Sequence, residues 1–246
     1  MKVSVCVDSL YFGKDFLESV RAAQRAGAKA VEFWSWEDKD LDGLVRLQEE
    51  TGLQVAVFCT RATQITDPKN RDAFVCGVRD SAAAAKRLGC KTMIATVGDD
   101  TGAPRAEQHA AIVEALRASL PVLEESGVTL VVEPLNIYVD HIGYYLSSSK
   151  EAFAIIEEVG SPYVKVLFDI YHQQINEGDI LRHMLPNLEK IGHIHCAGSN
   201  GRHELDNGEL NYPYLFKKLA EAGYDRYVGL EYFPERDPAD SLKDLL

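Results

Sequence analysis

Residues 128–136 read VTLVVEPLN, an apolar and β-branched run that ends in the carboxylate of Glu133 followed by a proline. A short apolar run of this kind predicts a buried strand of a parallel sheet. Seven further runs of the same character are spaced along the chain, separated by longer segments of helical period. The eight predicted strands are 3–7, 30–34, 54–59, 91–96, 128–133, 164–169, 191–195 and 227–232.

Helices are predicted between these strands, at 15–26, 41–51, 71–88, 106–126, 149–159, 179–186 and 214–222. Most of them stop at a glycine, as a left-handed C-terminal cap requires, and these glycines are Gly27, Gly52, Gly89, Gly127, Gly160 and Gly223. Eight strands with intervening helices predict an α/β protein, a (β/α)8 TIM barrel, as a single domain over 1–246. Only residues 233–246 follow the last strand, so the barrel is expected to have a short C-terminal end. An open doubly wound sheet is the alternative, although no GxGxxG or GxxxxGK[ST] motif follows any strand.

The composition argues against several classes of protein. The chain has 38 Asp and Glu against 26 Lys and Arg, a net charge of −12, which disfavours a nucleic-acid partner. No uninterrupted apolar stretch approaches the about 18 residues of a membrane span, and the N-terminus does not resemble a secretory signal. The five cysteines are odd in number, dispersed and never in a CxxC pair, so we expect a reduced, cytoplasmic protein with no membrane contact.

Four consecutive predicted strands end in residues of types that bind metal ions: Glu133, Asp169, His195 and Glu231. A barrel builds its active site at the C-terminal ends of its strands, so these four side chains are expected to converge. Three carboxylates and one imidazole suit Mn²⁺ or Mg²⁺, with Co²⁺ also possible. His193 shares a strand face with His195 and is expected one layer deeper, as a support or as a core histidine.

Glu133 and Glu231 are also the predicted acid and base, because their strands place them across the barrel mouth from each other. A substrate chelated through a carbonyl and its neighbouring hydroxyl would present a C–H bond to one of them. A divalent ion polarises that carbonyl and stabilises the enediolate that results. The predicted chemistry is therefore proton transfer on a small hydroxy-carbonyl compound.

Residues on the adjoining loops are candidates for binding substrate. His172, three residues after Asp169, is positioned either to contact a substrate oxygen or a ligating carboxylate, or to cap the following helix. Arg202 offers a fork for a carboxylate or phosphate, with a solvated surface charge as the alternative. Three further residues are expected in the pocket wall, with core packing as the alternative for the aromatic ones, and these are Glu32, Trp34 and Phe58.

Several strings, namely VEPLN, FDIYHQQ, GHIH followed by GRHE and NGELNY, and GLEY, resemble the xylose isomerase-like barrels, most closely their hydroxypyruvate isomerase branch. AVEFW and GLQVAVF extend this resemblance over nearly the whole chain. It implies a divalent metal ion held by the four strand-end residues, with the two glutamates as acid and base. It further implies that His172 and Arg202 contact substrate, and that the reaction interconverts hydroxypyruvate and tartronate semialdehyde.

Other functions stay open at this point. His195 stands where hydroxypyruvate isomerases often carry Gln, and residues 199–201 replace a Pro-Gly turn; this His is similar to the ketose 3-epimerases, which implies a sugar substrate at the same metal site. Endonuclease IV-type enzymes share the barrel superfamily, but they need a multi-zinc cluster and a DNA-binding face. A non-catalytic metal-binding barrel is the last alternative. A homo-oligomer is a further hypothesis, because a short C-terminal end leaves an apolar flank for a second subunit.

Overall fold

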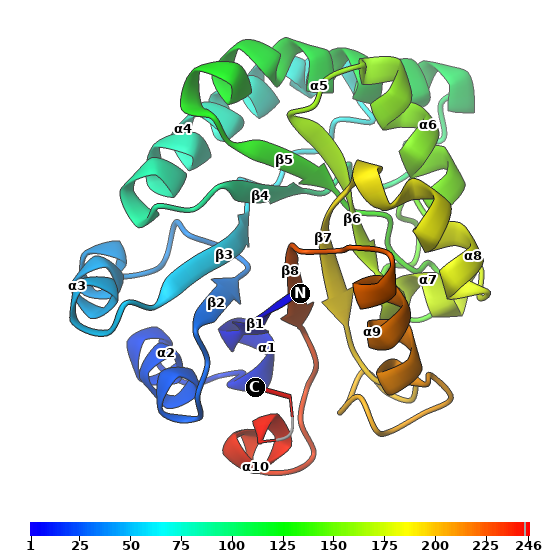
Figure 1. Ribbon diagram of the computed structural model, residues 1–246. Helices are drawn as coiled ribbons and strands as arrows, with labels where there is room; N and C mark the ends of the chain where they lie inside the picture. The colour runs from blue at the N-terminus through cyan, green and yellow to red at the C-terminus, as the bar shows by residue number, and fades with distance from the viewer. Residues whose placement is uncertain (244) are drawn as a thin grey trace.

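A closed barrel of eight parallel strands lies at the centre of the molecule in a computed structural model, which describes residues 1–243 and 245–246. The strands follow one another in sequence order, and β8 pairs with β1 to close the ring (Figure 1). Their bounds are β1 (Lys2–Cys6), β2 (Ala30–Phe33), β3 (Gln54–Cys59), β4 (Thr92–Ala95), β5 (Thr129–Val132), β6 (Val164–Asp169), β7 (Ile191–Cys196) and β8 (Tyr227–Leu230). The predicted (β/α)8 barrel is confirmed.

Helices surround this ring of strands (Figure 1). The predicted helices correspond to α2 (Phe16–Arg25), α3 (Leu41–Thr51), α4 (Arg71–Leu88), α5 (Arg105–Ser126), α6 (Ser149–Val159), α8 (Ile180–Met184) and α9 (Tyr212–Glu221). The segment 179–186 was expected as one helix, but α8 ends at Met184 and a 3-10 stretch, η2 (Leu185–Lys190), follows. The sequence did not predict the short elements α1 (Val7–Leu10), η1 (Pro68–Asn70), α7 (Ile170–Asn176) and α10 (Pro238–Leu242).

The ends of the helices follow the chemistry of their terminal residues. All six glycines predicted to stop helices have positive φ. Gly127, with φ 64°, ends α5 two residues before β5 begins, in a conformation that a side chain disfavours. Asp40, Ser148 and Asn211 cap the starts of α3, α6 and α9 by accepting a hydrogen bond from a backbone N–H of the first turn. The capping residues therefore fix where these helices begin and end relative to the strands.

The core has two layers. A large apolar cluster fills the space between the sheet and the helices, whereas a small one, Val57, Ile94, Val131 and Leu167, lies on the opposite face of β3 to β6. Because side chains alternate along a strand, this second cluster occupies the barrel interior. It shares that face with the residues at the strand ends, so it forms the floor beneath the candidate site.

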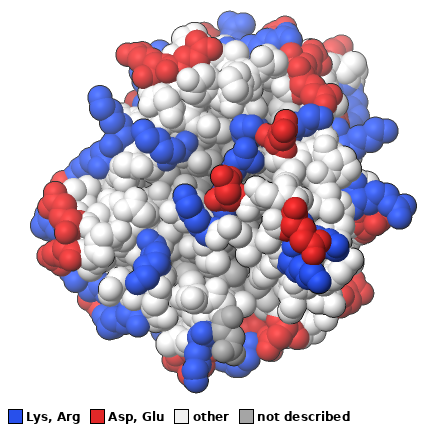
Figure 2. Space-filling model, viewed as in Figure 1, with Lys and Arg blue, Asp and Glu red and all other residues white. Residues whose placement is uncertain are grey.

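The outer surface is charged and mixed in sign. In Figure 2 the visible face carries Lys and Arg side chains interspersed with Asp and Glu. Within the described residues, no helix combines the length and the apolar character that crossing a membrane requires.

Candidate active site and metal centre

The four strand-end residues come together at one point. Glu133, Asp169, His195 and Glu231 each place one potential ligand atom so that all four atoms lie within 4.8 Å of one another. All four side chains are buried. They come from β5 to β8 or from the residue that follows the strand, so the convergence is a consequence of the closed barrel.

Asp169 is held by the helix that it starts. Its Oδ1 accepts hydrogen bonds from the backbone N–H groups of Tyr171 at 2.7 Å and His172 at 3.3 Å, which caps α7. Its other oxygen, Oδ2, faces the site and lies 3.4 Å from Nε2 of His172. One oxygen is therefore used for structure, while the second remains available as a ligand.

Glu231 is oriented by two donors. The indole Nε1 of Trp34 donates to Oε1 at 2.5 Å, and the guanidinium of Arg202 donates to Oε2, also at 2.5 Å. Burial opposes ionisation of this carboxyl group, but His195 and Arg202 outweigh that effect and hold its pKa well below the usual 4.5. Glu231 is therefore a carboxylate with a fixed orientation.

His195 lies between carboxylates on both sides of its ring. Nδ1 is 3.2 Å from Oε2 of Glu231 and 3.8 Å from Oε1 of Glu133, whereas Nε2 is 3.2 Å from Oε1 of Glu32. Burial lowers the pKa of His195, but Glu231 and Glu32 together raise it well above 6.5. The surrounding carboxylates thus stabilise positive charge at this point of the cluster.

The residues present fit a divalent metal ion. Both ring nitrogens of His195 are buried without a hydrogen-bond partner, and Nδ1 points into a set of three carboxylates. Buried carboxylates at this separation repel one another unless positive charge lies among them. Oxygen ligands with one imidazole suit Mn²⁺, Mg²⁺ or Co²⁺, and this set does not distinguish among these ions.

A cavity of about 300 Å³ opens above the cluster. Its wall is Trp34, Cys59, Ile94, Thr96, Glu133, Leu135, His141, His172, His195, Arg202, Glu231 and Phe233. Its walls therefore combine apolar side chains with groups that can bind a polar ligand, as is usual for a small-molecule site.

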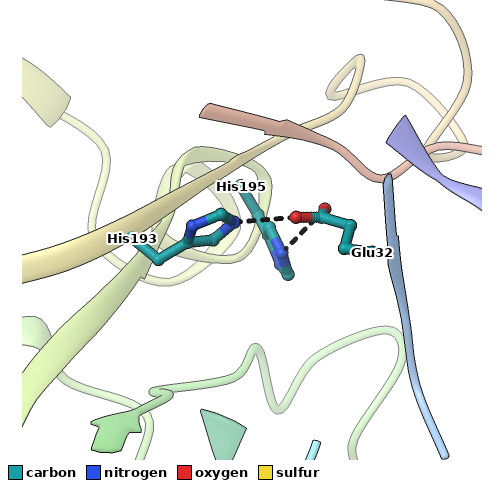
Figure 3. A group of neighbouring side chains, drawn as sticks. All are labelled: Glu32, His193 and His195. Atoms are coloured by element: carbon teal, nitrogen blue, oxygen red, sulfur yellow. Dashed lines mark hydrogen bonds and ion pairs between the residues drawn. The ribbon is translucent and has the colours of Figure 1, made fainter. Parts of the chain in front are cut away.

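Two residues expected in that wall lie elsewhere. Phe58 is fully buried and stacks on Phe33 at 5.4 Å between ring centroids, because alternation along β3 points Cys59, not Phe58, into the cavity. Glu32 lies inside the barrel beside Nε2 of His195 (Figure 3). It is not one of the residues that line the cavity. Trp34 does line the cavity.

Sequence reasoning missed six residues of the wall: Cys59, Ile94, Thr96, Leu135, His141 and Phe233. Cys59 could have been predicted, because side chains alternate along β3 and Cys59 therefore lies on the same face as Val57. His141 and Phe233 lie in irregular segments after β5 and β8, where the sequence pattern gives no direction for a side chain.

His172 presents a polar nitrogen to the cavity. Its Nδ1 lies 2.7 Å from the side-chain Nδ2 of Asn136 and also accepts from the backbone N–H of that residue at 3.3 Å. With two donors facing Nδ1, the ring hydrogen is on Nε2, which has no hydrogen-bond partner. Burial, then Arg202, lowers the pKa of His172 to about 3, so the ring is neutral.

Arg202 lies at the edge of the candidate metal site. Its guanidinium is bonded to Glu231, is 3.9 Å from Oδ2 of Asp169, and lies 5.3 Å from the ring centroid of Tyr171. The residue itself has φ 59°, an unusual value for a side-chain-bearing residue, in a loop where a Cβ on Gly198 would lie 2.3 Å from a backbone oxygen. The loop is thus folded tightly enough to hold Arg202 over the site.

The chain belongs to the family described as "Xylose isomerase-like TIM barrel", whose sequence profile matches residues 20–246. It is 33% identical over 245 residues to hydroxypyruvate isomerase of Escherichia coli (strain K12), which covers 96% of this chain and 95% of that protein. It is 44% identical over 140 residues to 2-oxo-tetronate isomerase of Cupriavidus necator, which covers 57% of this chain and 54% of that protein.

Solved structures of the same fold agree with this assignment. A structure described as AP endonuclease, family 2 from Brucella melitensis has a TM-score of 0.92 at 31% identity, covering 98% of this chain and 97% of that one. A 3-keto-D-glucoside 4-epimerase from E. coli has a TM-score of 0.86 and covers 99% of this chain and 97% of that one, but at 22% identity it shows the fold alone. Within its family, the chain is an isomerase or epimerase.

Proposed function

We propose that the chain is a metal-dependent isomerase of short hydroxy-oxo acids, which interconverts hydroxypyruvate and tartronate semialdehyde through an enediolate. One observation carries the proposal: Arg202 lies in the same cavity as Glu133 and Glu231 and is bonded to one of them. A guanidinium fork is the group that best recognises a carboxylate. The relation to the Escherichia coli hydroxypyruvate isomerase supports the same substrate.

The residues divide the chemistry among them. Glu133, Asp169, His195 and Glu231 would hold the divalent ion, which when bound polarises the substrate carbonyl and stabilises negative charge on its oxygen. Arg202 binds the substrate carboxylate, and the Nε2–H of His172 donates to a substrate oxygen. The apolar side chains in the cavity wall exclude water from the reacting carbons.

Glu133 and Glu231 form the acid/base pair. One carboxylate takes a proton from the hydroxymethyl carbon of hydroxypyruvate, and a proton is returned to the neighbouring carbonyl carbon. The hydroxyl proton moves at the same time to the former carbonyl oxygen, which completes the conversion to tartronate semialdehyde. Trp34 and Arg202 keep Glu231 ionised and oriented for its part in this transfer.

A ketose 3-epimerase is the second candidate, because Glu133 and Glu231 reach the cavity from β5 and β8, which are not neighbours. Two carboxylates on different sides of one substrate can remove a proton from one face and return it to the other. The candidates differ in the need for an anion partner, and only the first uses Arg202 to bind a carboxylate.

Proton exchange in D₂O tests the proposal. The chain is incubated with Mg²⁺ and hydroxypyruvate, tartronate semialdehyde, 2-oxo-tetronate and common ketoses, and the C–H signals are followed by NMR. We expect metal-dependent conversion of an acid, reduced about 10²–10⁴-fold in Glu133→Gln and in Glu231→Gln. The control is Glu177→Gln, whose carboxylate bonds to Ser148 and Ser149 at the start of α6.

Other results would redirect the assignment. Exchange with ketoses alone would favour the epimerase. An Arg202→Ala variant with full activity on the acid would remove the main residue-level support for the first candidate, because Arg202 would not bind the substrate carboxylate. A silent panel with Mg²⁺ demonstrably bound would contradict both candidates. An affinity for abasic duplex DNA that falls steeply with salt would favour the endonuclease-type alternative, against which the net charge of −12 argues.

A further inference from the structure

Glu32 is a buried carboxylate that the proposed chemistry does not use. It lies on β2 with its side chain inside the barrel, and it is 1% exposed. Figure 3 shows it facing the rings of His193 and His195, two residues of β7. Burying a carboxylate is costly unless its oxygens are paired, so the partners of Glu32 indicate what this residue does.

Each oxygen of Glu32 has a separate set of neighbours. Oε2 accepts from the hydroxyl of Ser4 at 3.0 Å and from Nε2 of His193 at 2.9 Å. Oε1 lies 3.2 Å from Nε2 of His195. On β8, a Cβ on Gly229 would lie 2.1 Å from Oε1, so only glycine leaves room for the carboxylate. Strands β1, β7 and β8 are thus all fitted around Glu32.

This arrangement gives the two nitrogens of His195 different roles toward a metal ion. In the structure each nitrogen lies 3.2 Å from a carboxylate oxygen, Nδ1 from Oε2 of Glu231 and Nε2 from Oε1 of Glu32, which fits the protonated ring. When Nδ1 gives up its hydrogen to bind a divalent ion, the one remaining ring hydrogen is on Nε2, which faces Glu32. We propose that Glu32 is a positioning residue, which fixes the orientation and tautomer of the His195 ring so that Nδ1 is presented to the metal ion.

This inference rests on the metal site of the proposed function, and it adds a residue outside the cavity to it. A carboxylate that accepts from the second nitrogen of a metal-binding histidine both orients the ring and makes it a stronger ligand. His193 contributes by binding Oε2, which leaves Oε1 directed at His195. The two histidine rings also pack edge to face, with centroids 4.9 Å apart.

Glu32, His193 and His195 are close enough together to hold an ion themselves. A second ion there would make Glu32 a ligand and not a positioning residue. The number of ions bound per chain separates the two roles, because the positioning role requires one ion and a second site requires two.

Mn²⁺ binding by Glu32→Gln tests the proposal directly. The electron paramagnetic resonance signal of free Mn²⁺ gives both the affinity and the number of ions bound. In the amide an NH2 donor replaces one of the two carboxylate oxygens, so the contact with either His193 or His195 is lost. We expect one ion per chain, with a Kd about 10–100-fold higher in Glu32→Gln and unchanged in Glu177→Gln.

A second variant keeps the test valid if Glu32→Gln does not fold. Gly229→Ala adds a methyl group against Oε1 and displaces the carboxylate while retaining its charge. We expect the same direction of change in Kd. Circular dichroism on each variant verifies that the barrel is intact.

A spectroscopic readout separates positioning from a general loss of structure. In the Co²⁺-loaded protein, the Nε2–H of a bound His195 gives an exchangeable, strongly shifted proton resonance. We expect Glu32→Gln to shift this resonance and to speed its exchange with solvent. An unchanged Kd and resonance would overturn the role of Glu32 while leaving the proposed function intact, and two ions per chain would also overturn it. Absence of Mn²⁺ binding by the unaltered chain would overturn both proposals.

Discussion

The two halves of the barrel interior differ in character at the same depth. Each strand of the barrel has an inward-facing residue two positions before its strand-end position. In β3 to β6 this residue is apolar, and the four side chains are Val57, Ile94, Val131 and Leu167, which we call the apolar half. In β1, β2, β7 and β8 the corresponding residues are Ser4, Glu32, His193 and Gly229, which we call the polar half. Ser4 and His193 donate to Glu32, and Gly229 leaves room for its carboxylate. One half of the floor is packed by dispersion and the hydrophobic effect, whereas the other is a hydrogen-bonded network.

The candidate metal ligands above the two halves differ in the same way. His195 and Glu231 stand over the polar half, and both are contacted by side chains from the first strands, Glu32 and Trp34. Glu133 and Asp169 stand over the apolar half, and Asp169 is oriented by backbone N–H groups of α7. The candidate metal centre is therefore positioned by side-chain hydrogen bonds on one side and by backbone geometry on the other.

The largest expected effect is a loss of stability from a change in the apolar half that leaves metal binding unchanged. Leu167→Ala removes a fully buried side chain from the apolar half, which should lower the free energy of unfolding by about 2–5 kcal/mol. Urea unfolding gives this loss, and Mn²⁺ affinity should stay within about twofold because no ligand changes its partners. A loss of affinity as large as that of Glu32→Gln would show that the halves do not differ in function.

A smaller effect is expected from Trp34, which connects the end of β2 to Glu231. Trp34→Phe keeps the aromatic wall but removes the donor to Oε1, a hydrogen bond to a charged group worth about 1.5–3 kcal/mol. We expect kcat/KM for the substrate found in the exchange panel to fall about 10–100-fold. The matched change on a wall residue without such a bond is Phe233→Leu, and an equal fall there would assign the loss to packing.

The sequence predicted the barrel well because two periodicities are strong in it. All eight strands were expected, with ends that differ by at most two residues from those observed, and α3, α4 and α6 agree with their predicted bounds. The sequence predicted that four residues meet, because the C-terminal ends of all strands in a closed barrel surround the same opening. These residues are Glu133, Asp169, His195 and Glu231. Short elements were missed because their boundaries carry little pattern of their own: α7 begins at Ile170, directly after the last residue of β6, with no separating loop.

Side-chain direction and long-range pairing were harder to predict. Phe58 was expected in the pocket because of its aromatic character. Side chains alternate along β3, however, so Phe58 points to the opposite face from Cys59 and stacks on Phe33. Glu32 was expected to contact substrate, but its partner His193 lies 161 residues away in the chain. No local pattern relates a carboxylate on β2 to a histidine on β7, so only the closed barrel shows that they meet.

The smallest expected effect concerns His172, the neutral histidine above the apolar half. Its pKa is about 3 in the folded chain, against about 6.5 for a histidine in the unfolded chain. Below pH 6.5 the unfolded chain therefore binds a proton that the folded chain does not, and stability is lost as the pH falls. This one group accounts for about 1.2 kcal/mol between neutral pH and pH 5.5. Because Asn136 donates to Nδ1, His172→Asn supplies an acceptor that does not titrate, and urea unfolding at both pH values should show a dependence shallower by that amount. Equal pH dependence in the two proteins would mean that His172 takes up its proton as readily in the folded chain as in the unfolded chain, in which case its charge at pH 5.5 would add to that of Arg202 above the site.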